Sequence, residues 1–234
     1  MQKRMIDALK TIPGVESVGL VDRPPLYYGA NSANVFTDTT TDLRPSNVAA
    51  EAMLYNISPE YFDAARTSFL VGRTLTWHDD KNSARVAVIN REFANKIFGS
   101  VTNAIGRYYK AGNGSRIQVV GIVENGKYAS LAEDPQPAMF LPILQSPSSQ
   151  TCLVVRSNRD LQQLVAAIKS TVQNAIEMPE DLMVRSFAYP KCAIPSVIAF
   201  GDRFNYRPLQ AYIPAVEKLR HRYNHSDQKP SLVA

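Results

Sequence analysis

Residues that bind metals or act as nucleophiles are scarce in this sequence. Its 234 residues include two cysteines, Cys152 and Cys192, and three histidines. Two cysteines make neither a disulfide framework nor a four-cysteine metal site, and they do not indicate a cellular compartment. Cys152 lies in an apolar, strand-like segment, which predicts a buried thiol. A disulfide-stapled scaffold and a cysteine-rich zinc domain are therefore excluded.

Long apolar segments are also missing. No window of the sequence approaches the ~20 apolar residues of a membrane span. The first ten residues carry charge, but the apolar segment of a signal peptide does not follow them. The sequence as written is therefore expected to be soluble, without a membrane anchor or an export signal.

The main part of the chain has almost no net charge. The formal net charge is +5, and residues 191–234 hold seven Lys or Arg against three Asp or Glu, so residues 1–190 are nearly neutral. A nucleic-acid-binding domain needs a concentrated basic face. We therefore expect no nucleic-acid partner for the main domain. The composition of the chain, 45% hydrophobic and 20% charged, is typical of a globular protein.

The hydrophobic pattern predicts an α+β fold in which strands outnumber helices. Ser58 is predicted to cap one helix, and Asn90 is predicted to cap a second helix that ends at Gly99. Ser157 and Asp160 have the spacing of a capping box for the longest helix. The predicted strands are residues 15–21, 49–57, 85–89, 116–125, 138–143, 151–156 and 181–187, and the predicted helices include residues 59–65, 91–98 and 158–177.

One segment nearly matches a phosphate-binding loop. Residues 121–128 read GIVENGKY, close to the pattern G-x-x-x-x-G-K-[ST]. In that motif a hydroxyl after the lysine binds Mg²⁺, but Tyr128 stands there, and Ile122 and Val123 prolong a strand. We therefore predict a strand followed by a turn at Asn125-Gly126. Residues 112–115, GNGS, lie between two strand-like segments and predict a hairpin turn.

Three histidines and their neighbours are the remaining candidates for chemistry. His221 and His225 have the spacing of two zinc ligands on a helix, but an arginine stands where zinc proteases have glutamate. His78, Asp79 and Asp80 could ligate a metal or transfer protons, although a solvated polar bend is the more ordinary interpretation. The sequence has no G-x-S-x-G motif. We therefore predict no catalytic residue, no metal site and no cofactor.

Four segments in a fixed order resemble a known family. Residues 57–80 (ISPEYFDAARTSFLVGRTLTWHDD) precede residues 86–99 (VAVINREFANKIFG), residues 105–109 (IGRYY) and residues 119–143 (VVGIVENGKYASLAEDPQPAMFLPI). This order resembles the extracytoplasmic core domain of MacB/FtsX-like ABC transporter permeases, and is closest to the permeases with duplicated domains. The resemblance covers residues 1 to 187.

The resemblance implies a domain of two lobes. Residues 1–65 and 150–187 would form a membrane-proximal β-α-β lobe, and residues 66–149 would form a smaller β-rich lobe inserted between them. Residues 188–234 diverge from the family and are expected to be a poorly structured basic tail. His78, Asp79 and Asp80 would then lie in a polar bend on the surface of the inserted lobe.

The resemblance also implies a function without catalysis. In such permeases an ABC-type ATPase subunit or domain hydrolyses ATP, and transmembrane helices relay the motion to a domain at the periplasmic face of the inner membrane. A second permease copy or a periplasmic adaptor would be the other partner. Since the sequence lacks those helices, we expect a truncated or frameshifted fragment. The alternative is a stand-alone soluble module for ligand binding or scaffolding, with Tyr27 and Tyr28 as candidate contacts.

Overall fold

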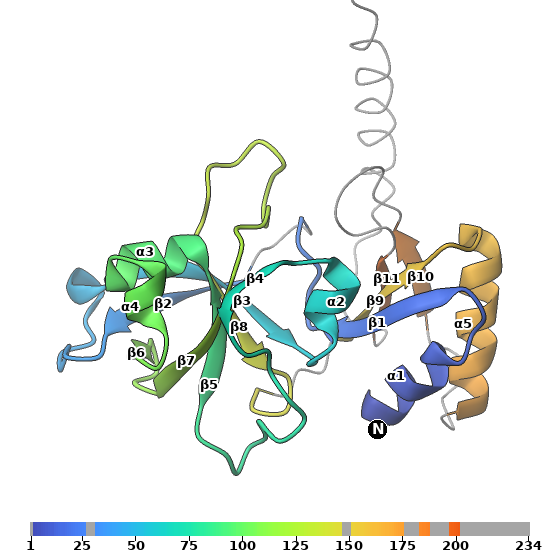
Figure 1. The fold of residues 1–234 in the computed structure, drawn as a ribbon, viewed down its shortest axis with the longest axis horizontal. Coiled ribbons are helices and arrows are strands. Elements are labelled where there is room, and N and C mark those ends of the chain that lie inside the picture. Colours follow the sequence, from blue (N-terminus) through green and yellow to red (C-terminus); the bar gives the residue numbers. More distant parts are fainter. Residues whose placement is uncertain (1, 27–30, 147–150, 176–182, 188–196, 202–234) are drawn as a thin grey trace, which may run out of the picture. The chain divides into compact units, whose positions relative to one another are not determined.

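Strands dominate the structure, as the hydrophobic pattern predicts. The computed structural model describes the chain except residues 1, 27–30, 147–150, 176–182, 188–196 and 202–234 (Figure 1). The helices are α1 (Gln2–Lys10), α2 (Tyr61–Ala65), α3 (Arg91–Phe98), α4 (Val101–Ala104) and α5 (Leu161–Ala175), with a 3-10 turn at Pro45–Asn47. The strands are β1 (Val15–Val21), β2 (Ser32–Thr37), β3 (Ala50–Ile57), β4 (Phe69–Gly72), β5 (Val86–Asn90), β6 (Tyr108–Ala111), β7 (Arg116–Val123), β8 (Ala138–Pro142), β9 (Thr151–Ser157), β10 (Met183–Phe187) and β11 (Val197–Gly201).

Six strands pair in a closed ring. Their order is β3-β2-β6-β7-β5-β8, and β8 pairs again with β3, so that every strand has two neighbours within this set. The β3–β8 and β5–β7 pairs are parallel and the other pairs are antiparallel. β4 adds to the end of β7. We call these six strands the ring.

The interior of the ring is a hydrophobic core to which all six strands contribute. Side chains from every strand of a closed ring can form one cluster only if they point to the inside of the ring. The helix α3 contacts β3, β5, β7 and β8, and its Phe93 joins the same cluster. The hydroxyl of the fully buried Tyr109 lies 3.2 Å from the sulfur of Met139. The strand residues of this core include Val35, Ala52, Ala87, Tyr109, Val119 and Met139.

Four further strands form what we call the terminal sheet, in the order β10-β11-β9-β1. All its pairs are antiparallel, and β1 and β9 pair from Val15↔Ser157 to Val21↔Cys152. α1 and α5 cover the face of β1 and β9 that carries Leu20 and Leu153, and these elements share a second core. α2 packs against the same two strands. A Cβ at Gly19 would lie 2.6 Å from the Cα of Tyr61, so glycine permits the close approach of α2 to β1.

In the described part of the chain, one strand pair links the terminal sheet to the ring. β1 and β3 share a single register pair, Val21↔Ile57. A third hydrophobic core, which we call the shared core, spans this place. It combines Val21 and Cys152 with ring residues such as Phe140 and with Phe62 of α2.

Two predicted helix caps are wrong, and two are confirmed. Ser58 does not cap α2, because its buried hydroxyl instead accepts a hydrogen bond from the backbone N–H of Leu20. The long helix α5 begins at Leu161 with Asp160 as its cap, because the Asp160 carboxylate accepts hydrogen bonds from the N–H groups of the first turn. Ser157 donates to the carbonyl oxygen of Gly14. The Asn90 cap and the stop at Gly99, a glycine with φ of 81°, are confirmed.

One strand lies where the basic tail was expected to be poorly structured. β11 pairs with β9 and β10, so the prediction is wrong for these five residues. β11, with the apolar sequence VIAFG, pairs with the edge of β9. That strand lies about 40 residues earlier in the sequence. The rest of residues 188–234 lies outside the described residues. Among the helices of the described part, none has both the length and the apolar character to cross a membrane.

Candidate functional site

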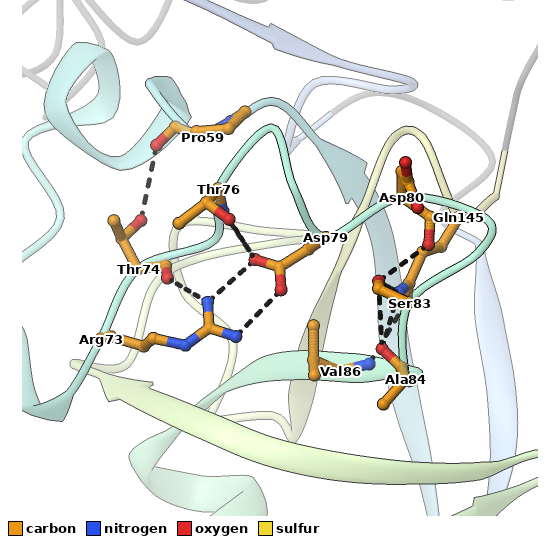
Figure 2. Close-up of polar contacts among 10 residues, drawn as sticks. All are labelled: Pro59, Arg73, Thr74, Thr76, Asp79, Asp80, Ser83, Ala84, Val86 and Gln145. Carbon is orange, nitrogen blue, oxygen red and sulfur yellow. Dashed lines mark hydrogen bonds and ion pairs between the residues drawn. The ribbon is translucent and has the colours of Figure 1, made fainter.

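The connection between β4 and β5, residues 73–85, is the candidate site that the sequence singles out. We call it the β4–β5 bend. It contains His78, Asp79 and Asp80, and Figure 2 shows that its side chains hydrogen bond within the bend and to neighbouring segments.

Asp79 is the centre of the bend. Its carboxylate accepts two hydrogen bonds from the guanidinium of Arg73, at 2.8 and 2.9 Å. It also accepts from the backbone N–H and the hydroxyl of Thr76, at 2.7 and 3.0 Å. Burial raises the pKa of the Asp79 carboxyl, but the hydrogen bonds from Arg73 and Thr76 outweigh it and leave this pKa below its usual value. A carboxylate with these four bonds is a structural anchor for the turn.

The predicted bend is therefore found, but Asp79 does not lie on its surface. Asp79 is 6% exposed, whereas His78 is exposed. Asp80 accepts a hydrogen bond from the backbone N–H of Asn82, which closes a local turn. The three side chains thus have three different environments and do not converge on one point.

The first half of the bend is tied to α2 and to the terminal sheet. The indole N–H of Trp77 donates to the carboxylate of Glu60 at 2.9 Å, and the Trp77 ring packs against the core beneath α1 and α5. Leu75 is buried in the shared core. The hydroxyl of Thr74 donates weakly to the carbonyl oxygen of Pro59, at 3.4 Å (Figure 2).

The second half of the bend is tied to the segment after β8. The amide of Gln145 donates to the hydroxyl of Ser83 and to the carbonyl oxygen of Ala84, at 3.0 and 2.8 Å. Its oxygen accepts from the backbone N–H of Val86 at 3.3 Å (Figure 2). The bend therefore joins the ring, α2 and the core beneath α1 and α5 by side-chain contacts.

Replacing Trp77 by phenylalanine is expected to weaken this link. The ring stays in the core, but Glu60 loses its donor, and its other carboxylate oxygen is already buried without a partner among the described residues. The expected loss in the free energy of unfolding is about 2 kcal/mol, because a hydrogen bond to a charged group is removed. Urea denaturation followed by circular dichroism measures it. The exposed change Lys81→Ala in the same bend should cost less than about 0.5 kcal/mol, and equal losses in the two variants would contradict the link.

Two glycines allow the start of the bend to lie against β7. Gly72 of β4 pairs with Gly121 of β7 and has φ of 88°, a conformation that favours glycine. A Cβ on Gly121 would overlap the carbonyl oxygen of Arg73. The backbone N–H of Arg73 donates to the carbonyl oxygen of Val120 at 2.9 Å. These close contacts position Arg73 toward Asp79.

Buried polar side chains flank the strand pair that joins the terminal sheet to the ring. Asn56 donates its backbone N–H to one carboxylate oxygen of Asp22 at 3.0 Å and its amide N–H to the other at 2.7 Å. The backbone N–H groups of Leu20 and Ser58 donate across the same pair of strands, each at 3.0 Å. Burial raises the pKa of Asp22, although hydrogen bonds from Asn56 and Arg23 oppose this rise. We call Asp22, Asn56 and Ser58 the polar joint.

The segment that resembles a phosphate-binding loop, residues 121–128, forms hydrogen bonds within the domain. Ile122 and Val123 lie in β7, as predicted, and the side chain of Asn125 accepts the N–H of Glu92 in the first turn of α3. The hydroxyl of Tyr128 accepts the N–H of Gly126 at 3.1 Å, so this amide serves an internal contact.

A single glutamate organises the loop that follows. The Glu133 carboxylate accepts the backbone N–H groups of Tyr128, Ala129 and Ser130, at 2.5 to 3.1 Å. Leu131, at the tip between these contacts, is 55% exposed.

The other predicted residues have mixed outcomes. Residues 112–115 form the predicted hairpin turn between the antiparallel strands β6 and β7. Cys152 is buried, as predicted, and burial raises the pKa of its thiol to about 12. Tyr27, Tyr28, Cys192, His221 and His225 lie outside the described residues. Within the described residues no three His, Cys, Asp or Glu side chains are grouped so that they could hold a metal ion.

Sequence patterns did not point to Arg73, Glu133, Asp22 or Asn56 as polar anchors. The carboxylates of Asp22 and Glu133 stand in Pro- or Ser-rich loop sequence, where charged residues are ordinarily exposed. The six-residue separation of Arg73 and Asp79 across a turn-forming sequence was the one available signal. The ion pair between Arg73 and Asp79 can be predicted only when the conformation of the turn between them is known.

Comparison with known families identifies the class of protein. Residues 2–171 match the family described as "MacB-like periplasmic core domain", a mixed α/β domain of ABC transporter permeases. The match covers most of the chain. The chain therefore belongs to this family, and the resemblance seen in its sequence is confirmed.

Individual relatives share less with the chain. The macrolide export ATP-binding/permease protein MacB of Burkholderia lata is 27% identical over 123 residues, which are 53% of this chain and 17% of that protein. The chain thus spans about a sixth of the length of this relative. The extracellular domain of the noncanonic ABC-type transporter YknZ from Gram-positive bacteria is 22% identical, with a TM-score of 0.45, and the match covers 75% of this chain and 80% of that one. The periplasmic region of MacB from Actinobacillus actinomycetemcomitans is 18% identical, with a TM-score of 0.41. That match covers 94% of this chain and 73% of the other.

Proposed function

We propose that this chain works as the non-catalytic periplasmic core domain of an ABC transporter permease, in export or in mechanotransmission. Membership of the MacB-like family supports this role. The buried carboxylates Asp22 and Asp79 support it too, because the hydrogen bonds they accept serve the joint and the bend. The domain would act through protein contacts at the periplasmic face of the inner membrane.

The proposed partners follow from the permease architecture. An ABC-type ATPase subunit or domain would drive the domain through transmembrane helices of a longer permease, and a second permease copy or a periplasmic adaptor would contact it outside the membrane. The relative from Burkholderia lata, whose name includes both an ATP-binding and a permease function, is about six times as long as the matched segment. Nucleic acid is not among the proposed partners.

The observation that carries the proposal is the single strand pair between the terminal sheet and the ring. In this proposal two lobes, one from residues 1–65 and 150–187 and one from residues 66–149, pivot about this strand pair and the shared core that surrounds it. Because β2 and β3 pair with β6 and β8, we propose one change of boundary and assign residues 32–57 to the second lobe. Val21↔Ile57 would then be the hinge, and the β4–β5 bend would transmit force across it.

The genomic context is the first test. In-frame coding sequence for apolar spans of about 20 residues next to this chain would supply the permease. A flanking sequence without such spans would favour the alternative, a stand-alone ligand-binding or scaffolding module. A thermal-shift screen against small molecules would then follow, because a specific ligand raises the stability of the folded state.

The decisive test is a distance measurement in the intact permease. Spin labels on p-acetylphenylalanine at the exposed positions Lys10 and Asn113 report the distance between terminal sheet and ring. We expect this distance to differ between membranes with ATP plus vanadate and membranes with ADP. A permease with an inactive ATPase site is the matched control and should show no change. If the distance between the two labels is the same in every nucleotide state of the active permease, mechanotransmission is refuted.

A further inference from the structure

The polar joint contains a buried carboxylate at a place where two strands need only backbone hydrogen bonds. β1–β3 is the single strand pairing between the terminal sheet and the ring within the described residues. Asp22 and Asn56 are 9% and 8% exposed, and both lie next to the Val21↔Ile57 pair. A change in their bonding therefore acts directly on the connection between the two parts.

We propose that Asp22 and Asn56 form a proton-sensitive lock between the terminal sheet and the ring. The neutral carboxyl group of Asp22 holds the two parts in one arrangement, and the charged carboxylate loosens it. This inference rests on the proposed movement of two lobes and adds a means by which the pH outside the cytoplasm regulates that movement.

The hydrogen bonds of the pair explain why a proton changes it. In the charged form all groups that reach the Asp22 oxygens are donors, namely the N–H and amide N–H of Asn56 and the N–H of Arg23. The amide oxygen of Asn56 is buried without a partner among the described residues. When a proton from solvent binds the carboxylate, the resulting O–H can donate to that oxygen. The neutral form thus removes a buried charge and satisfies a buried acceptor.

Among the described residues, the titratable groups that interact with Asp22 are not carboxyl or imidazole groups. The titratable groups that interact with it are Arg23 on its own segment, Tyr55 of β3 and Cys152 of β9, whose sulfur lies 4.0 Å from the Asp22 carbonyl oxygen. Burial raises the pKa of Cys152 to about 12 and also raises the pKa of Tyr55. Arginine stays charged at every pH of interest. Asp22 is therefore the acidic group of this set, and its pKa is raised from a value near 3.8.

The sign of the effect follows from the raised pKa of Asp22. The contribution of the neutral carboxyl to stability is fully present below the unfolded-state value near 3.8, and it is lost as the pH rises through the higher pKa of the folded state. Acidification therefore tightens the joint, and a rise of pH through this pKa loosens it.

Pulsed electron spin resonance on the full 234-residue chain, labelled at Lys10 and Asn113, tests the lock. We expect a broader distance distribution at about pH 8 than at about pH 4.5, because the charged form of Asp22 becomes more populated as the pH rises. Asp22→Asn, which cannot be charged and offers Asn56 a donor, should give the narrow distribution at both pH values. Asp63→Asn makes the same chemical change at an exposed position of α2 and should respond to pH as the unmodified chain does.

Two further results keep the test decisive. Asn56→Ala removes the side-chain amide that donates to Asp22 and the buried oxygen that would accept its proton, and should therefore reduce the pH response, even if Asp22→Asn fails to fold. The melting temperature of Asp22→Asn minus that of the unmodified chain should be largest near pH 8 and fall toward pH 4.5. A pH response that persists in Asp22→Asn, one that is undiminished in Asn56→Ala, or an unmodified chain without any response overturns the lock. A nucleotide-driven change of distance in the intact permease would still support the proposed function in that case.

Discussion

Replacing Gly121 by alanine is expected to lower the free energy of unfolding by about 3 kcal/mol, at the upper end of the range for overpacking. The new methyl group would overlap the carbonyl oxygen of Arg73, which is backbone and cannot rotate away. β4 would have to move off β7, and Arg73 would then lose its position beside Asp79. Urea denaturation with circular dichroism measures the effect.

Gly112→Ala is the matched control for this prediction. Gly112 lies in the β6–β7 hairpin, where a Cβ would be 3.7 Å from its nearest neighbour, an ordinary contact. Neither glycine has a positive φ, so the two substitutions differ in steric environment and not in backbone strain. Gly112→Ala should change the stability by less than about 0.5 kcal/mol. Equal effects at the two positions would show that β4 is not held closely against β7.

Asp79→Ala is expected to lower the free energy of unfolding by about 2 to 3 kcal/mol. The substitution removes four hydrogen bonds at once, two from Arg73 and two from Thr76. Hydrogen bonds to charged groups contribute about 1.5 to 3 kcal/mol each. The total stays well below their sum, because the Arg73 side chain is 48% exposed and water can replace its partner.

The pH dependence of this loss distinguishes Asp79 from Asp22. The pKa of Asp79 is lowered in the folded state, so its contribution is present above the unfolded-state value near 3.8 and disappears as the pH falls through the lower pKa. The difference between the unmodified chain and Asp79→Ala should be constant at neutral pH and shrink only in acid. For Asp22→Asn the difference should instead be largest at neutral pH. His78→Ala, at an exposed neighbour, should cost less than about 0.5 kcal/mol, and a loss as large as that of Asp79→Ala would contradict the anchoring role.

Local sequence signals predicted the longer elements well. The strands β1, β3, β5, β7, β8 and β9 lie where apolar alternation or continuous apolar sequence placed them. The cap at Asn90 and the stop at Gly99 were also predictable, because both depend on backbone groups within a few residues. The short strand β2, Ser32–Thr37, is not among the strands that the hydrophobic pattern predicted.

Polar side chains were predicted less well than strands. Ser58 has the residue type and position of a helix cap, but the neighbouring strand β1 supplies a donor that its hydroxyl accepts instead. Asp79 was expected in a solvated bend, yet Arg73 and Thr76 enclose it. In each case the side chain bonds to whichever group packs beside it, and propensity carries no information about that group.

The sequence by itself determined the fold class, most strands and the family, because hydrophobic periodicity and the order of short segments are properties of neighbouring residues. The tertiary structure decided the closure of the ring through β3 and β8, the single strand pair between β1 and β3, and the charge environments of Asp22 and Asp79. β3 and β8 are about 80 residues apart, and Asp22 meets Asn56 across 34 residues. Burial and pairing over such separations depend on the packing of whole elements, which no local pattern specifies.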